Sequence, residues 1–212
     1  MTNSPDTQER TLEKFRNKMF GGGARPNLFE CELNFPTESI PTESDLAELS
    51  ETTRFLVKAA NLPASTLGVI DVPFRGRNLK IAGDRTFDPW TITVINDSDF
   101  LIRTAFERWM NLINKHQDAA GKTNPIEYQQ DVVVKQFGRA SVTGNKPPKS
   151  DEAIPVLKQY KFYGVFPTSV SAIDLSYDSS DTIEEFTVDL QVQWWDALDE
   201  DGRSQLGTIE AV

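Results

Sequence analysis

Polar and apolar side chains alternate over residues 185–194, within a strand expected at about 183–195, and this pattern constrains the fold more than any other feature of the chain. A period of two is typical of a β-strand with one buried face and one solvated face. The predicted buried face carries Phe186, Val188, Leu190, Val192 and Trp194. The opposite face is polar, has no basic residue, and carries Glu185, Thr187, Asp189, Gln191 and Gln193. The chain is therefore expected to build a sheet that covers a core with one side of this strand.

Similar patterns predict most of the other elements. The strands flanking Arg75-Gly76-Arg77 predict a projecting hairpin, and Gly83-Asp84-Arg85 predicts a turn. Asp97-Ser98 is expected to cap a helix, because the apolar residues that follow repeat at helical spacing: Ile102, Ala105, Phe106, Trp109, Leu112 and Ile113. Strands are expected at 28–35, 52–60, 67–74, 78–82, 86–96, 127–137, 156–166 and 169–177.

These elements do not alternate in βαβ order, so the expected fold class is mainly β. We predict an antiparallel β-barrel or sandwich flanked by one α-helix. The 212 residues suit one domain at 25–196, with an N-terminal extension at 1–24 and a C-terminal tail at 197–212. The extension is expected to hold a short amphipathic helix at 12–20, and residues 36–44 are expected to form an exposed loop followed by a helical turn.

Charge is unevenly distributed along the chain, whose formal net charge is −10. Residues 30–51 and 162–202 hold acidic residues and no base, whereas bases cluster at 75–80 and 146–161. This segregation favours a self-assembling surface, although solvated loops explain any single patch as well. The acidic balance argues against a protein that grips nucleic acid through its phosphates, but it allows one past which DNA slides.

No pattern of catalytic, metal-binding or cofactor-binding residues is found, and we expect no enzyme activity and no cofactor. His116 is the single histidine and Cys31 the single cysteine, too few for a typical zinc site. Trp194-Trp195 is expected to place one indole in the core and one at an interface; a stacking platform for single-stranded nucleic acid is the alternative, which the acidic neighbours disfavour. A small hydrolase or a monomeric binding module are the other classes of protein considered.

The N-terminal residues are polar, and no apolar run approaches the length of a membrane span. We therefore expect synthesis in a reducing cytoplasm and no membrane insertion.

Three stretches carry a specific resemblance to a known family. They are 24–29 (ARPNLF), 81–97 (IAGDRTFDPWTITVIND) and 164–168 (GVFPT), the last followed by Asp174, Tyr177, residues 183–188 and Trp195-Asp196. In order and spacing they resemble the tail tube proteins of contractile-tailed, T-even-like bacteriophages over residues 24–196. The sequence departs from compact members of the family in its N-terminal stretch, its loop at 36–44, its region at 141–156 and its tail.

The resemblance implies a fold related to the tube protein of type VI secretion. It implies homohexameric rings that stack into a tube and line a channel for DNA ejection into the host. The implied partners are the tail sheath protein, the baseplate hub, the tail terminator and a tape measure protein in the lumen; DNA passes without specific binding. The implied location is the virion tail, assembled in the host cytoplasm. The alternative is the tube of a phage-derived bacteriocin or another contractile injection system.

The resemblance also gives two sets of candidate site residues. The polar face formed by Glu185, Thr187, Asp189, Gln191 and Gln193 is the candidate lumen lining, unless that face merely meets solvent or the helix. The hairpin is expected to stack rings and join neighbouring subunits through Phe74, Arg75, Arg77, Asn78 and Lys80.

Overall fold

The computed structural model describes residues 12–19, 23–40, 43–139, 154–199 and 202–205. The elements in chain order are α1 (Leu12–Lys18), β1 (Phe29–Glu32), the 3-10 turn η1 (Thr37–Ser39), α2 (Glu43–Leu56), β2 (Val57–Ala60), β3 (Ser65–Phe74), β4 (Arg77–Phe87), β5 (Trp90–Ile95), α3 (Leu101–Ile113), α4 (Pro125–Tyr128), β6 (Gln130–Phe137), β7 (Val156–Val170), β8 (Glu185–Gln191) and β9 (Trp194–Leu198). Most of the predicted loop at 141–156 and of the predicted tail lies outside the described residues.

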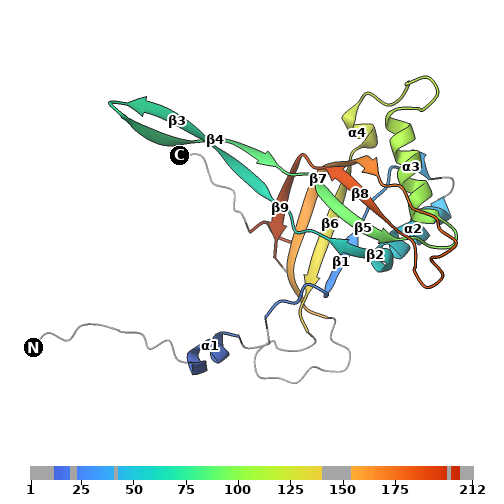
Figure 1. Cartoon of the computed structure of the whole chain (residues 1–212), viewed down its shortest axis with the longest axis horizontal. Helices are drawn as coiled ribbons and strands as arrows, with labels where there is room; N and C mark the ends of the chain where they lie inside the picture. The colour runs from blue at the N-terminus through green and yellow to red at the C-terminus, as the bar shows by residue number, and fades with distance from the viewer. Residues whose placement is uncertain (1–11, 20–22, 41–42, 140–153, 200–201, 206–212) are drawn as a thin grey trace, which may run out of the picture.

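Seven strands form one antiparallel sheet in the order β1-β6-β7-β8-β5-β2, and β9 pairs with β7 beside this path. The two end strands, β1 and β2, contact each other, so the sheet curls strongly around its core. The remaining strands, β3 and β4, form a separate two-stranded hairpin that projects from the body (Figure 1). The predicted fold class, mainly β with an antiparallel sheet, is confirmed.

Strand β7 organises the sheet because its two halves pair with different neighbours. Its first half pairs with β6 and β9, and its last residues pair with β8. Gly164 lies at the junction with a φ of 61°, a conformation that glycine adopts without the steric cost of a Cβ. The prediction of two strands at 156–166 and 169–177 is therefore wrong. A single strand bends at Gly164 and ends at Val170, and residues 171–184 form a loop with no helix or strand.

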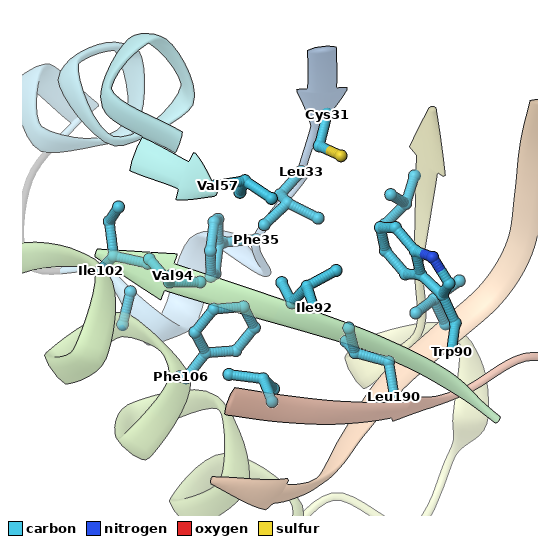
Figure 2. Packing of buried hydrophobic residues seen from close by; sticks show 14 of the residues in the cluster. Cys31, Leu33, Phe35, Val57, Trp90, Ile92, Val94, Ile102, Phe106 and Leu190 are labelled. Atoms are coloured by element: carbon cyan, nitrogen blue, oxygen red, sulfur yellow. The ribbon is translucent and has the colours of Figure 1, made fainter. Parts of the chain in front are cut away.

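The core fills the inside of the curled sheet (Figure 2). Cys31 and Leu33 of the β1 segment and Ile92 and Val94 of β5 are almost completely buried, so alternate residues of these strands face the core. Phe35 packs edge-on against Phe106, with ring centroids 5.1 Å apart. The predicted apolar stripe of α3 is also confirmed: Ile102, Ala105, Phe106 and Trp109 are buried against this core.

The segment predicted as a strand at 52–60 is mostly helix. Helix α2 continues to Leu56, and only Val57–Ala60 forms a strand. Thr53 is buried in the helix, and its hydroxyl donates to the carbonyl of Ser50 at 3.0 Å. Helix α2 contacts β1, β2 and α3, so it covers the place where the sheet's ends meet. Two long helices pack on the sheet, where one was predicted.

Helix α3 begins at Leu101, three residues after the predicted cap. The N-cap residue is Phe100, so the predicted cap position is wrong. Asp97 still contributes to the start of the helix, because its Oδ1 accepts a hydrogen bond from the Leu101 amide at 3.1 Å. At the other end of this region, Trp109 Nε1 donates to the carbonyl of Tyr128 at 2.7 Å and ties α3 to α4. The helix is thereby fixed over β7, which it contacts.

The hairpin is longer than predicted. Gly83-Asp84-Arg85 lies within β4 and is no turn, and the strand predicted at 86–96 is divided by Asp88-Pro89 between β4 and β5. The ladder has an irregularity between Leu67 and Val69. There Gly68 and Gly83 approach so closely that a Cβ on Gly83 would lie 3.2 Å from the backbone of Gly68. The close approach of two glycines lets the ladder continue past the irregularity.

Candidate assembly surfaces

The polar face predicted on the last strand lies on the outer side of β8. Glu185 and Thr187 are exposed, and Asp189 and Gln191 are half-buried. In the ladder with β5, Thr187 lies opposite Thr93 and Asp189 opposite Thr91. Thr91 donates its hydroxyl to Asp189 Oδ1 at 2.6 Å. This surface, which we call the polar face, is therefore formed by short hydroxyl and carboxylate side chains of two strands.

A basic residue from another strand completes the polar face. Lys58, at the bulge of β2, places its Nζ 2.5 Å from Glu185 Oε1. The sequence pattern of β8 alone shows no base, but the neighbouring strand supplies one. The charge of Glu185 is therefore balanced within the chain, and Asp189 is the polar face's other carboxylate on β8.

The prediction of one continuous strand over residues 183–195 is wrong. Strand β8 ends at Gln191 and β9 begins at Trp194, because the two strands pair with different halves of β7. Gln193 lies in the crossing between them, where its amide donates to the carbonyl of Tyr163 at 3.2 Å. Of the five predicted lumen residues, four therefore share β8 and Gln193 lies outside it.

Trp194 does not face the core as predicted. Its side chain is exposed and stacks on Tyr163, with ring centroids 3.8 Å apart and an interplanar angle of 10°. Lys161 lies over the Tyr163 ring at 4.6 Å. Trp195 is the indole packed against the core, and its ring contacts Tyr160 edge-on at 5.8 Å. Because the alternation breaks at Gln193, Trp195 and not Trp194 faces the core.

The hairpin ends in a tight two-residue turn. Phe74 pairs with Arg77, and the turn residues Arg75 and Gly76 have φ values of 47° and 82°. Positive φ at both central residues is the type I′ geometry that matches the twist of a hairpin. The Arg75 guanidinium lies 5.3 Å from the centroid of the Phe74 ring. Of the predicted stacking residues, Phe74, Arg75 and Arg77 thus lie at the tip, and Asn78 and Lys80 follow along β4.

The register divides those residues between two faces. Ile70 lies opposite Ile81, Val72 opposite Leu79, and Phe74 opposite Arg77 on one side of the hairpin. On the other side Asp71 lies opposite Lys80, with an ion pair of 3.5 Å, and Pro73 opposite Asn78. The first side, which we call the apolar hairpin face, is formed by Ile70, Val72, Phe74, Leu79 and Ile81. All five side chains are at least 40% exposed.

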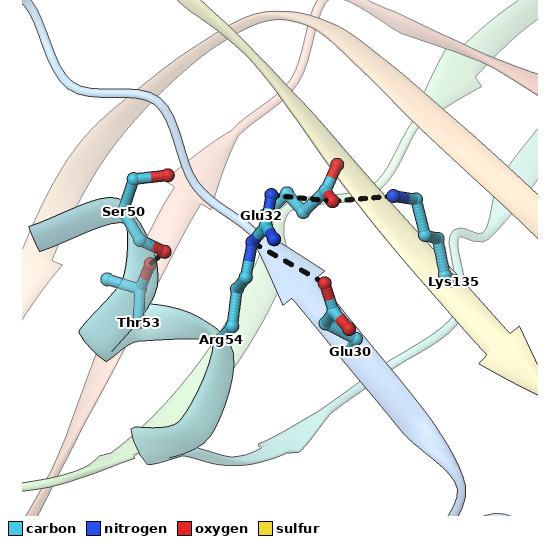
Figure 3. A network of polar contacts seen from close by, with 6 residues as sticks. All are labelled: Glu30, Glu32, Ser50, Thr53, Arg54 and Lys135. Atoms are coloured by element: carbon cyan, nitrogen blue, oxygen red, sulfur yellow. Dashed lines mark hydrogen bonds and ion pairs between the residues drawn. The ribbon is translucent and has the colours of Figure 1, made fainter. Parts of the chain in front are cut away.

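The acidic run at 30–51 is partly neutralised inside the chain (Figure 3). Arg54 of α2 lies 3.5 Å from Glu30 and 3.0 Å from Glu32, and Lys135 of β6 lies 2.5 Å from Glu32. Lys122 lies 3.2 Å from Glu38. These contacts link α2 and β6 to β1. Sequence spacing could not show them, since the partners lie far apart in the chain.

The acidic loop at 171–184 is different. Within the described part of the chain, Asp174, Asp178 and Asp181 form no ion pair with a lysine or arginine. Glu184 accepts a hydrogen bond from Asn96 Nδ2 at 2.9 Å. The loop also exposes apolar side chains, with Leu175 at 82%, Tyr177 at 108% and Ile183 at 72%.

Neither single residue considered for chemistry stands in a reactive setting. Burial, with a smaller contribution from Glu30, raises the pKa of the Cys31 thiol to about 12, so this cysteine packs as an apolar residue. His116 lies in the exposed turn after α3. Among the described residues, no three His, Cys, Asp or Glu side chains gather as metal ligands, and no helix is long and apolar enough to cross a membrane.

Comparison with known proteins places these surfaces in context. The family described as phage tail tube protein matches residues 24–197. The chain is 32% identical over 176 residues to the tail tube protein gp19 of Enterobacteria phage T4, covering 83% of this chain and 93% of that protein. It is 29% identical over 185 residues to the tail tube protein of Serratia phage KSP90, covering 85% and 93%.

Solved structures share the fold. A chain of the anti-feeding prophage baseplate aligns with a TM-score of 0.54 at 15% identity, covering 84% of this chain and 97% of that one. A chain of the sheath/tube terminator of the PVC extracellular contractile injection system aligns with a TM-score of 0.53 at 13% identity, covering 84% and 97%. At these identities the likeness shows the fold alone. The family match over residues 24–197 and the phage relatives show that the chain belongs to the phage tail tube protein family.

Proposed function

We propose that this tail tube protein assembles into homohexameric rings that stack into a tube, and that DNA passes through the channel of this tube during ejection. The observation that carries self-association is the apolar hairpin face, which lies in solvent although it holds five large apolar side chains. A two-stranded hairpin is at best marginally stable alone, and an apolar face of this kind marks a contact with another protein. In a tail tube family member, the partner at hand is another copy.

An aqueous channel requires that the sheets of several subunits join into one larger barrel. One seven-stranded sheet curled around a side-chain core encloses no aqueous channel, whereas barrels of about 16 or more strands do. The polar face is the proposed lining, with Glu185, Thr187, Asp189 and Gln191 of β8 beside Thr91 and Thr93 of β5. Its support is the lack of an unpaired base: Lys58 is bound to Glu185. A lining without free Lys or Arg avoids contacts that would hold DNA phosphates. Gln193, at the end of this surface, is included in the proposal.

The hairpin is proposed to stack rings and to join neighbouring subunits. Phe74, Arg75 and Arg77 lie at its tip, while Asn78 and Lys80 lie on the side opposite the apolar hairpin face. The two sides therefore offer different contacts: one is apolar, and the other mixes polar side chains with Val69 and Pro73. This arrangement supports a hairpin that contacts more than one neighbouring subunit, with a different surface for each.

The proposed role is structural, and the proposed location is the virion tail after assembly in the host cytoplasm. Tail sheath protein, baseplate hub, tail terminator and a tape measure protein in the lumen are the proposed partners. Relatives at 32% identity are phage tail tube proteins, whereas the injection-system likenesses rest on fold at 15% identity or less. A phage tail is therefore favoured over a bacteriocin or another contractile injection system.

The test is electron microscopy of the purified protein in negative stain, combined with light scattering. We expect hollow rings with six subunits, or tubes built from them, as concentration rises. A protein that stays monomeric at millimolar concentration would contradict the proposal. Solid fibres without a central channel would contradict the lumen alone.

A further inference from the structure

The apolar hairpin face combines exposed apolar side chains with positive charge. Arg77 lies on this face opposite Phe74, and Arg75 lies in the adjoining turn. Neither arginine forms an ion pair with a carboxylate in the described part of the chain. A surface that fits this face must therefore supply apolar contacts together with carboxylates.

The loop at 171–184 has these properties. It exposes Leu175, Tyr177 and Ile183, and it holds Asp174, Asp178 and Asp181 without a basic residue of its own. Its ends are fixed on the body, since the Ser171 amide donates to the Thr187 carbonyl at 2.9 Å and the Asn96 amide donates to the Glu184 carbonyl at 2.9 Å. By contrast, Glu30 and Glu32 of the other acidic run already bind Arg54.

The two surfaces cannot meet within one chain. In Figure 1 the hairpin projects at one end of the long axis, and the loop between β7 and β8 lies at the opposite end beside α2 and α3. Strand β5 runs between them: it begins at Trp90, three residues after the end of β4, and ends at Ile95, opposite Glu185. A contact between such surfaces is head-to-tail, and contacts of this type generate closed rings or open helical assemblies.

We propose that the apolar hairpin face of one copy docks on the loop at 171–184 of a neighbouring copy, with Arg75 and Arg77 facing the loop's aspartates. This inference rests on the proposed function, because it names the partner surface of the hairpin within the tube. The apolar side chains from both copies leave water together, and the charges set the register of the contact.

Two charge-reversal variants test the pairing. Variant A carries Arg75→Glu and Arg77→Glu, and variant B carries Asp174→Lys and Asp178→Lys. Each alone places like charges across the contact, so each should need roughly tenfold more protein than the wild type for half of it to assemble. Mixed in equal amounts, A and B offer opposite charges at every contact. The mixture should therefore assemble near the wild-type concentration, as measured by sedimentation and negative-stain microscopy.

The outcomes separate this inference from the proposed function. If the wild type forms tubes but B assembles as well as the wild type, the loop is not the docking surface. If A and B are both folded and impaired but their mixture gains nothing, the pairing of the two surfaces is wrong. A wild type that never assembles would overturn the proposed function itself. Circular dichroism of each variant establishes that it is folded.

Cross-linking provides a second measurement that does not depend on charge. Arg77 lies on the docking face, opposite Phe74. Chains with Arg77→Cys and chains with Ser179→Cys, mixed during assembly and treated with a short bismaleimide, should give covalent dimers. The native Cys31 does not compete, because it is fully buried. Chains with Asp118→Cys, on the exposed turn after α3, are the matched control in place of Ser179→Cys. Equal dimer yields from both mixtures would overturn the proposal.

Discussion

The body of the protein and its projecting hairpin use the same antiparallel pairing but differ in what covers them. In the body, Ile92, Val94 and Leu190 show no exposure, and every strand has one face against the core. In the hairpin, Val69, Ile70 and Leu79 are all more than half exposed. The chain therefore covers one face of its large sheet by itself, whereas both faces of the hairpin stay exposed.

This difference shows that the body carries the core of the fold, and it supports the proposal that the hairpin serves assembly. Large apolar side chains stabilise a fold only where they are removed from water, at about 25 cal/mol per Å². The hairpin's apolar side chains stay in water in the single chain, so they contribute little to its stability. The same area becomes available when copies associate. Substitutions in the two regions should consequently change different measurements.

The largest effect is expected from Phe106→Ala in the body. Phe106 is fully buried between Phe35 and Trp109, and removing its ring leaves a cavity in the centre of the core. We expect a loss of about 3–5 kcal/mol in the free energy of unfolding. Chemical denaturation of dilute protein measures it. A loss below ~1 kcal/mol would show that the core does not depend on this helix contact.

The matching change in the hairpin is Val72→Ser with Leu79→Ser, a cross-strand pair on the apolar hairpin face. Because both side chains are exposed in the single chain, the free energy of unfolding should change by less than about 1 kcal/mol. Assembly into rings or tubes should be abolished, because polar hydroxyls replace the apolar contact. Sedimentation measures the second result.

Val69→Ser is the control for the hairpin, because Val69 is also exposed but lies on the side opposite the apolar hairpin face. It should leave the apolar contact intact. If the variant with Val72→Ser and Leu79→Ser unfolded as readily as Phe106→Ala, the hairpin would contribute to the stability of the fold. The proposed division between a folding body and an assembling hairpin would then be wrong.

Two glycines with positive φ sharpen the comparison. Gly164 in β7 has φ 61° and a Cβ there would meet Gln193 Cγ at 2.7 Å, whereas Gly76 in the hairpin turn has φ 82° and open space. Gly164→Ala should lower the stability of the body by about 1–3 kcal/mol. Gly76→Ala should leave the melting temperature of the dilute chain within about one degree, because the hairpin is not part of the core. Equal shifts from both would contradict this.

The sequence predicted those parts of the fold whose pattern is local. Alternation at Cys31, Leu33 and Phe35 and helical spacing at Ile102 and Phe106 state directly which side meets the core. Prediction failed where a distant partner decides the structure. Thr53 has a strand-forming side chain but is buried in a helix that covers the ends of the sheet.

The candidate surfaces show the same limit. The break at Gln193 exists because β8 and β9 pair with different halves of β7. The sequence of residues 183–195 alone gives no sign of this change in pairing. Likewise, the sequence of β8 shows no base on the polar face, but Lys58 of β2, 127 residues from Glu185 in sequence, binds Glu185 there. The hairpin was predictable because its turn and both of its strands are contiguous in the chain.

Reversing the charge of the polar face tests its proposed role in the channel, as the hairpin variants test the proposed role of the hairpin in assembly. Glu185→Lys with Asp189→Lys should leave tube assembly intact but slow DNA release several-fold, because lysines in the channel would bind passing phosphates. Ejection kinetics of phage carrying the variant measure this. Normal kinetics at low salt would contradict the lumen assignment. Thr187→Ser, on the same face, is the neutral control.

The smallest effect is expected from Lys58→Ala, which removes the base that binds Glu185. Both side chains are at least a third exposed, so solvent screens the ion pair and the free energy of unfolding should fall by at most about 1 kcal/mol. The loss should shrink further at high salt, because exposed charges are screened within about 10 Å at 0.1 M ionic strength. The unpaired Glu185 would then add negative charge to the polar face. If that face lines the channel, DNA release should remain as fast as in the wild type or become slightly faster. A slower release would indicate that Lys58 guides DNA. In that case the polar face could not be a lining that DNA merely passes.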